Sequence, residues 1–181
     1  MTSRILTGLV LILLALYLIA WSPKWLFLLA VLATVFRGLY EYFFISQQAG
    51  LRSFPVVGYV AGGLLCLAQA VDLRTAGTLG LAVLVLLLLL TLALALPWTT
   101  DLKQYLGAAA STVLGVLYVG FTLSLLLPLR FTDPIDGRRL IIFLFVVIWA
   151  GDICAFFFGR FLGRTLLFPR VSPKKTVEGA V

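Results

Sequence analysis

The sequence has no histidine and only two cysteines among its 181 residues. Without histidine, neither a serine–histidine catalytic pair nor a histidine-ligated zinc site can form. Cys66 and Cys154 lie in apolar runs without metal-ligand spacing, so we interpret both as packed thiols. Charged residues are also scarce, at 12%, about half the share that is usual in soluble domains.

Hydrophobic residues make up 62% of the chain, and the mean hydropathy is +1.14. This composition predicts a protein that lies in a membrane. The net charge is +7, but no soluble basic domain is present to carry a nucleic-acid site. We therefore expect anionic lipid headgroups or other phosphates as partners, and no nucleic acid.

Polar and Pro/Gly interruptions divide the chain into six apolar stretches, most of them close to the 17–25 residues that a helix needs to cross the hydrocarbon core. The sequence thus predicts an all-α fold, a polytopic transmembrane bundle over residues 1–158. Residues 159–181 are predicted to form a basic loop and the start of a further helix. The predicted spans are Ile5–Ala20, Trp25–Ile45, Phe54–Val71, Ala76–Leu96, Tyr105–Leu127 and Leu140–Phe158.

The distribution of Lys and Arg predicts the orientation, because cytoplasmic loops carry an excess of both. With six spans, the N-terminus, the second and fourth loops and the tail share one side, and this side carries the larger number of cations. We therefore predict that the N-terminus and the tail face the cytoplasm. The cations on that side are Arg4, Arg52, Lys103, Arg160, Arg164, Arg170, Lys174 and Lys175; those opposite are Lys24, Arg74, Arg130, Arg138 and Arg139.

Asp152 is the candidate functional carboxylate within a span. A charged side chain at a helix centre costs about 2.5–3.5 kcal/mol even on lenient insertion scales, so Asp152 should face protein or a polar cavity. Asp133 and Asp136 have the D-x-x-D spacing of some magnesium sites. Pro134 and Gly137 indicate that this segment is a turn instead.

The tail contains a possible phosphate site. Ser172 and Pro173 are typical of a helix start, which would place Lys174 and Lys175 in the first turn. Two lysines are unfavourable at the positive end of a helix unless an anion binds there. A phosphate held by both lysines, by free N–H groups and by the Ser172 and Thr176 hydroxyls would meet this requirement. A polybasic anchor to acidic lipids would need only the charge, and this reading stays open.

Four segments in a fixed order resemble the bacterial phosphatidate cytidylyltransferase family. The opening Arg4-Ile-Leu-Thr-Gly8 also resembles the usual entry of that family's first helix, and the resemblance extends over the whole chain. The four segments are Trp149-Ala-Gly-Asp152, Ala155-Phe-Phe-Phe-Gly-Arg160, Gly163-Arg164 and Ser172-Pro-Lys-Lys-Thr-Val-Glu-Gly179.

The resemblance implies transfer of a cytidylyl group from CTP to phosphatidate, giving CDP-diacylglycerol and pyrophosphate, with Mg²⁺ as cofactor. It also implies a bacterial inner membrane and a homodimer. Asp152, Lys174 and Lys175 are the implied catalytic residues, with Asp152 also as a metal ligand, and Glu178 is expected to hold one of the lysines in place. The implied substrate-binding residues are Arg160, Arg164, Ser172, Lys174, Lys175, Thr176 and Glu178.

Members of that family continue beyond this motif with further spans and a carboxylate-bearing signature, neither of which is in this sequence. The resemblance therefore predicts an incomplete form in which residues 1–181 alone are inactive. Two other classes remain open. A small transporter or channel subunit would use Arg37, Glu41 and Asp152 as a polar pathway, and a structural membrane protein would need only the spans and the basic tail. Neither accounts for the Ser172–Gly179 motif.

Overall fold

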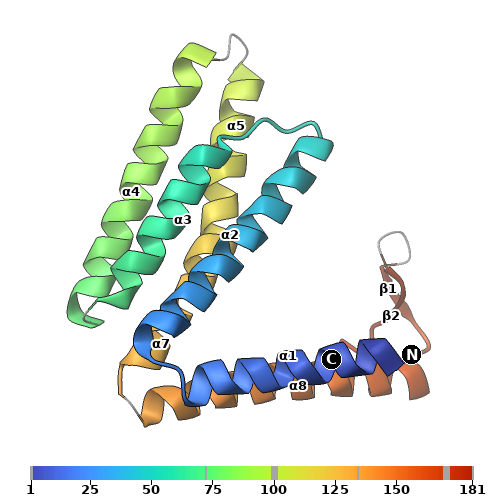
Figure 1. Ribbon diagram of the computed structural model, residues 1–181. Helices are drawn as coiled ribbons and strands as arrows, with labels where there is room; N and C mark the ends of the chain where they lie inside the picture. Colours follow the sequence, from blue (N-terminus) through green and yellow to red (C-terminus); the bar gives the residue numbers. More distant parts are fainter. Residues whose placement is uncertain (1, 72, 99–101, 134, 169–171, 181) are drawn as a thin grey trace. The chain divides into compact units, whose positions relative to one another are not determined.

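The computed structural model describes residues 2–71, 73–98, 102–133, 135–168 and 172–180. The described chain is almost entirely helical, with one short hairpin near its C-terminal end (Figure 1). The elements in order are α1 (Thr2–Ala20), α2 (Lys24–Gln48), α3 (Pro55–Ala70), α4 (Leu73–Trp98), α5 (Leu102–Gly115), the π-helix η1 (Val116–Phe121), α6 (Thr122–Ser124), α7 (Leu126–Phe131), α8 (Asp136–Phe161), β1 (Leu166–Phe168) and β2 (Ser172–Thr176).

The six predicted spans correspond to α1, α2, α3, α4, the continuous stretch from α5 to α7, and α8. Four segments are long and apolar enough to cross a membrane: Lys24–Gln48, Gly77–Leu94, Gln104–Phe131 and Asp136–Phe161. The apolar helices Leu6–Ala20 and Pro55–Gln69 are shorter. The prediction of a polytopic all-α membrane bundle is confirmed, and the protein is an integral membrane protein.

The chain divides into two compact units, Met1–Arg138 and Arg139–Val181. The boundary predicted from the sequence is residue 158, after the last span. In the structure almost the whole of α8 belongs with the tail, because the hairpin packs against the C-terminal end of this helix.

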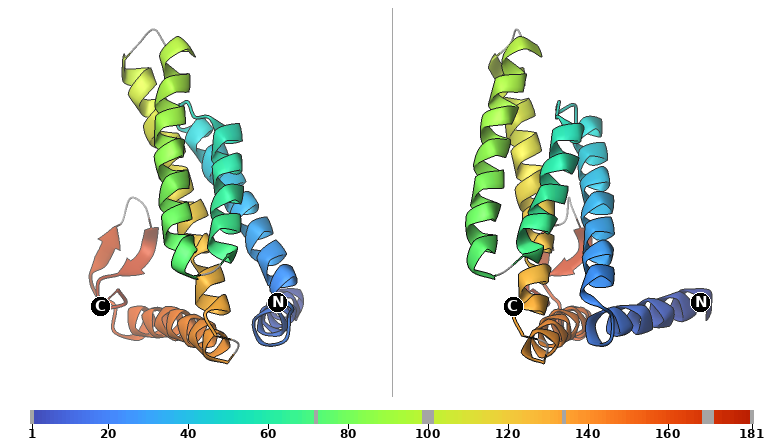
Figure 2. Two further views of the ribbon diagram at one scale, coloured as in Figure 1. Left: turned by 90° about the vertical axis from the view of Figure 1, so that its left-hand side faces the viewer. Right: turned by 60° about the vertical axis from the view of Figure 1, so that its left-hand side comes forward.

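In the first unit, α2, α3, α4 and the α5–α7 stretch run side by side (Figures 1 and 2). Small residues allow their backbones to approach closely. A Cβ on Gly58 would lie 2.6 Å from Cε2 of the buried Phe43 ring, and one on Gly62 would lie 2.7 Å from Cδ1 of Leu39. Gly120 on η1 faces the same helix, since its Cβ would come within 3.5 Å of the Gly62 Cα.

The fifth predicted span contains a π-helix and a break. α5 ends at Gly115, the wider turns of η1 follow, and α7 begins at Leu126. Threonine and serine hydroxyls bind carbonyls of the preceding turn here, as Ser124 Oγ does with Phe121 O at 2.8 Å. Such bonds and Pro128 both disturb regular α-helical pairing. This span packs among its neighbours, because Ala108, Ala109 and Val116 are buried.

Candidate functional site

The helix that the sequence predicts at Ser172 is not formed. Residues Ser172–Thr176 form the strand β2, which pairs antiparallel with β1 so that Leu166 lies opposite Thr176 and Phe168 lies opposite Ser172. The connection between the strands, residues 169–171, lies outside the described residues.

Two local preferences explain the strand. Lysines in a first helical turn face the positive end of the helix dipole, which disfavours the helix when no anion is bound. Thr176 and Val177 are β-branched, and β1 offers a partner strand of two leucines and a phenylalanine. Pro173 is tolerated because a two-stranded hairpin has only edge strands.

The hairpin docks on the end of α8 through three glycines. Gly159 and Gly163 lie four residues apart, and Thr176 packs against both: a Cβ on Gly163 would lie 2.7 Å from Thr176 Cγ2, and one on Gly159 would lie 3.2 Å from Thr176 Oγ1. A Cβ on Gly179 would lie 2.7 Å from the carbonyl oxygen of Ala155. At Gly163 and Gly179 an added Cβ would lie less than 3.0 Å from neighbouring atoms, so a larger residue there forces the structure to shift, whereas the contact at Gly159 is tight but less close.

The predicted site residue Thr176 is therefore at the centre of this contact. Its Oγ1 is buried and has no hydrogen-bond partner among the described residues. Leaving a buried hydroxyl without a partner costs free energy, and such groups in native structures call for an explanation. A ligand that accepts or donates a hydrogen bond at this position would supply the missing partner.

Glu178 is hydrogen-bonded to the backbone of the turn after α8. Its carboxylate accepts hydrogen bonds from the backbone N–H groups of Arg164, at 3.1 Å, and Thr165, at 3.1 and 3.3 Å. The turn after α8 presents these two N–H groups to the carboxylate. The side chain of Lys174 lies outside the described residues, so the expectation that Glu178 holds a lysine stays a prediction. Its own backbone N–H and those of Arg164 and Thr165 lower the pKa of Glu178.

We predict that the turn loosens in acid. Because the folded pKa of Glu178 lies below its ordinary value of 4.5, the carboxylate stabilises the fold above that value, and the stabilisation is lost as the pH falls through the folded pKa. In hydrogen exchange followed by NMR, the Arg164 and Thr165 amides should lose protection over this acidic range. Glu178→Gln should show reduced protection already at pH 7. Equal protection in both proteins at pH 7 would contradict this role.

Asp152 is exposed on α8. Within the described residues only 6% of the apolar window of α8 is buried, and the expectation that protein or a polar cavity covers Asp152 stays a prediction. No ion pair or hydrogen bond engages Asp152 in the part of the chain that the structure describes. Asp152, Ala155 and Gly159 are spaced i, i+3 and i+7, so they share one helix face. The carboxylate therefore lies on the face where Gly179 docks.

The cationic candidates surround the same hairpin. Arg160 lies in the last turn of α8, Arg164 lies in the turn held by Glu178, and Lys175 lies on β2; all three side chains are exposed. Ser172 is half-buried at the start of β2. The backbone of Lys174 is part of β2, but its side chain lies outside the described residues. The predicted residues are thus brought together on one small unit.

The described residues do not make a complete metal site. No group of three or more His, Cys, Asp or Glu side chains comes together within the part of the chain that the structure describes. Asp133 is confirmed as a turn residue: its Oδ1 accepts the N–H groups of Ile135, at 2.8 Å, and Asp136, at 3.0 Å. These bonds lower the pKa of Asp133. Asp152 is thus a single ligand candidate.

Arg37 and Glu41, the other polar pair within a span, form an ion pair at 2.7 Å with both side chains more than half exposed. Neither residue lines the cavity beside Gln47 and Phe54 or the cavity beside Gln69 and Phe121. The pair therefore gives no support to a polar pathway.

Sequence reasoning did not assign the glycines that position the hairpin. Gly159 and Gly163 were named only as members of the motif segments. Their spacing of four residues is nevertheless the usual signal for close backbone contact in membrane proteins. The hydrogen bonds from the backbone N–H groups of Arg164 and Thr165 to Glu178 could not be predicted from the side chains in the sequence. They form because the turn after α8 points these N–H groups toward the carboxylate.

The comparisons with known proteins agree with this arrangement of motifs. The sequence profile of the cytidylyltransferase family matches residues 2–181. A protein of Brucella suis biovar 1 named phosphatidate cytidylyltransferase is 34% identical over 184 residues, which cover 99% of this chain and 62% of the relative. A Haemophilus influenzae protein of the same name is 28% identical over 99% of this chain and 67% of its own length.

A third relative, also named phosphatidate cytidylyltransferase, comes from Staphylococcus saprophyticus; it is 40% identical over 73 residues, or 40% of this chain. No solved structure matches the chain.

The apolar helices and the basic unit that follows them define a polytopic membrane protein with a candidate phosphate site. The chain belongs to the cytidylyltransferase family. It spans about 62% of the length of the Brucella relatives.

Proposed function

We propose that this protein takes part in transferring a cytidylyl group from CTP to phosphatidate. A phosphate oxygen of the lipid attacks the α-phosphorus of CTP, the bond from that phosphorus to the bridging oxygen breaks, and pyrophosphate leaves. The observation that carries the proposal is the docking of the Ser172–Gly179 segment on the α8 face that bears Asp152. The shared name of the relatives points to the same reaction.

The proposed roles follow from charge and position. Nucleotidyl transfer spreads negative charge over phosphoryl oxygens, so the protein mainly supplies positioning and cations. Arg160, Arg164, Lys174 and Lys175 would bind phosphate oxygens, with Arg suited to bidentate contacts and Lys to a point contact. The Ser172 and Thr176 hydroxyls would orient the bound group. Glu178 acts indirectly, because it holds the turn that carries Arg164.

A divalent metal is generally expected for this class of reaction, and we propose Mg²⁺, which prefers oxygen ligands. The described residues do not fit a complete Mg²⁺ site, since Asp152 is their single candidate ligand on this face. We therefore assign no step to the ion, and Asp152 is at most one of its ligands. A homodimer also remains a prediction.

The membrane arrangement is the second part of the proposal: a bacterial inner membrane, with the tail in the cytoplasm, where CTP is made. The bias of Lys and Arg toward one side supports it. A single cysteine at Thr165, in a background with Cys66 and Cys154 replaced by serine, tests it. We expect a membrane-impermeant thiol reagent to label this cysteine in inverted vesicles and not in intact cells. Labelling in intact cells would reverse the orientation.

The activity is tested on the full-length gene product in lipid. We expect release of pyrophosphate that requires both CTP and phosphatidate, together with formation of a CDP-lipid. Lys175→Gln should raise the apparent KM for CTP by about tenfold or more, because a charge-assisted contact to phosphate is lost. If Lys175→Gln changes only the preference for anionic lipid, the strand is a membrane anchor. Pyrophosphate release without phosphatidate would contradict the proposed acceptor.

A further inference from the structure

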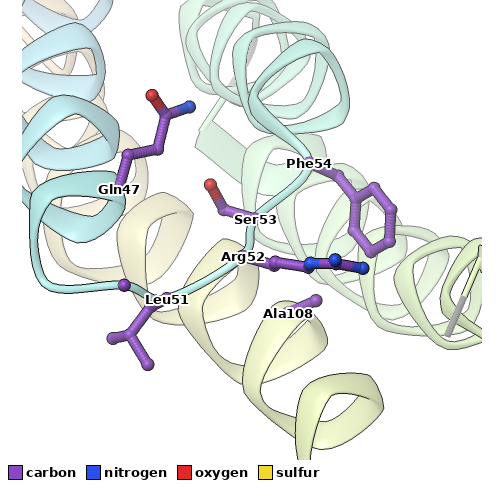
Figure 3. Close-up of a pocket in the computed structure, with 7 residues that line it drawn as sticks. Gln47, Leu51, Arg52, Ser53, Phe54 and Ala108 are labelled. Carbon is purple, nitrogen blue, oxygen red and sulfur yellow. The ribbon is translucent and has the colours of Figure 1, made fainter. Parts of the chain in front are cut away.

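A cavity of about 500 Å³ lies at the connection between α2 and α3 in the first unit (Figure 3). The C-terminal end of α2, the connecting loop and one face of α5 form its walls. The lining residues are Gln47, Gly50, Leu51, Arg52, Ser53, Phe54 and Ala108. None of them belongs to the tail or to the site proposed above.

Buried hydrogen bonds fix the loop that forms this cavity. Ser46 Oγ on α2 lies 2.6 Å from Ser111 Oγ on α5, with both residues buried. The backbone N–H of Phe54 donates to Thr112 Oγ1 at 2.8 Å, and this hydroxyl donates to the carbonyl of Ala108 at 2.8 Å. Gly50 turns the chain with φ of 76°, a conformation that favours glycine. The cavity is therefore preformed.

Polar groups of the loop lack partners within the described chain. Ser53 Oγ is buried and makes no hydrogen bond. The exposed Arg52 side chain makes no ion pair or hydrogen bond with described residues. Figure 3 shows the Ser53 hydroxyl turned toward the Gln47 side and the Arg52 guanidinium extending toward the Phe54 side. A buried hydroxyl without a partner is costly unless a ligand or water satisfies it.

The charges of the lining select the ligand class. Arg52 is the charged residue among the lining residues, and no carboxylate accompanies it, so an anion is favoured. Arginine is suited to phosphate because its planar guanidinium donates two parallel hydrogen bonds. The ligand must also be available where two apolar helices end, which is the depth of lipid headgroups.

We propose that this cavity binds the phosphate of an anionic phospholipid headgroup. The Ser53 hydroxyl donates to a phosphate oxygen inside the cavity, and Arg52 neutralises the charge at its rim. Gln47 offers an amide to the polar part of the headgroup, and the exposed Leu51 lies beside the acyl region. This proposal does not depend on the proposed enzymatic function.

The test uses phosphatidylglycerol, which is neither substrate nor product of the proposed reaction. The detergent-purified protein is titrated with this lipid, and retained lipid is counted by native mass spectrometry. We expect one tightly retained molecule in the wild type, about tenfold weaker retention in Arg52→Gln, and a smaller loss in Ser53→Ala. Arg138→Gln, an exposed arginine at the other end of the unit, is the charge-matched control and should retain the lipid normally.

Ala108→Phe tests the cavity itself, because its ring would occupy the space beside the loop. We expect it to lose the retained lipid while Arg52 remains. Melting temperatures of Arg52→Gln and Ser53→Ala near that of the wild type confirm that a loss of lipid is not unfolding. Equal losses in Arg52→Gln and Arg138→Gln would overturn the proposal in favour of general surface attraction. Displacement of the lipid by millimolar inorganic phosphate, with the same dependence on Arg52, would identify a free-anion site and overturn the lipid assignment.

Discussion

Replacing Asp152 by Asn in the full-length gene product should reduce turnover about 100-fold or more while the protein is still made and inserted. A carboxylate cannot stabilise negative phosphoryl charge directly, so this loss is expected from the proposed role of Asp152 as a ligand of the divalent cation; its size is that of removing one positioned polar group from a reacting centre. Expression should survive because Asp152 is exposed and has no described partner that the substitution would leave unsatisfied. Such a surface change usually alters the free energy of unfolding by no more than about 0.5 kcal/mol.

Steady-state kinetics with CTP and phosphatidate varied separately measure this effect. A fall in kcat with little change in either KM would indicate that Asp152 acts mainly in the transition state. Asp133→Asn is the matched control, because Asp133 caps a turn and its amide replacement retains an oxygen acceptor. Near-normal turnover of Asp152→Asn would remove Asp152 from the proposed site.

The spans could be predicted from the sequence, because a bilayer imposes a length and a composition that single segments display. The predicted Trp25–Ile45 is contained in α2, Lys24–Gln48, and Leu140–Phe158 is contained in α8. The π-helix at Val116–Phe121 could not be predicted, since its residues are as apolar as those of the regular turns before it. Its formation depends on packing against α2 and α3, where Gly120 meets Gly62.

In the tail, by contrast, the local sequence predicts a helix where the structure has a strand. Ser172 and Pro173 are typical of a helix start, yet β2 forms because it can pair with β1 and dock on α8. The pairing of Leu166 with Thr176 and the contacts of Thr176 with Gly159 and Gly163 join residues ten or more positions apart, so no local pattern reports them. The residues selected by the resemblance of motifs, Asp152, Arg164 and Thr176 among them, belong to this unit, and their joint role in one site stays a prediction.

Gly163→Ala should undock the hairpin from α8 and thereby lower turnover, even though Gly163 touches no substrate in the proposed reaction. Its new Cβ would lie 2.7 and 2.8 Å from Cγ2 and Oγ1 of Thr176 and would also meet the backbone carbonyl of Gly159. Thr176 is held in β2, so neither neighbour can move without breaking the contact. Overpacking of this kind costs about 1–3 kcal/mol.

Hydrogen exchange measured by mass spectrometry on peptides covering residues 162–180 should show faster exchange in Gly163→Ala, and turnover should fall together with protection. Gly151→Ala on the same helix is the control, because nothing lies within 4 Å of its Cβ and alanine favours a helix over glycine by about 1 kcal/mol. The control should therefore exchange and turn over like the wild type. If Gly163→Ala loses turnover while the hairpin stays protected, the glycine serves substrate access rather than docking. If Gly163→Ala keeps both its turnover and the protection of the hairpin, the close contact between Gly163 and Thr176 is not required for the site.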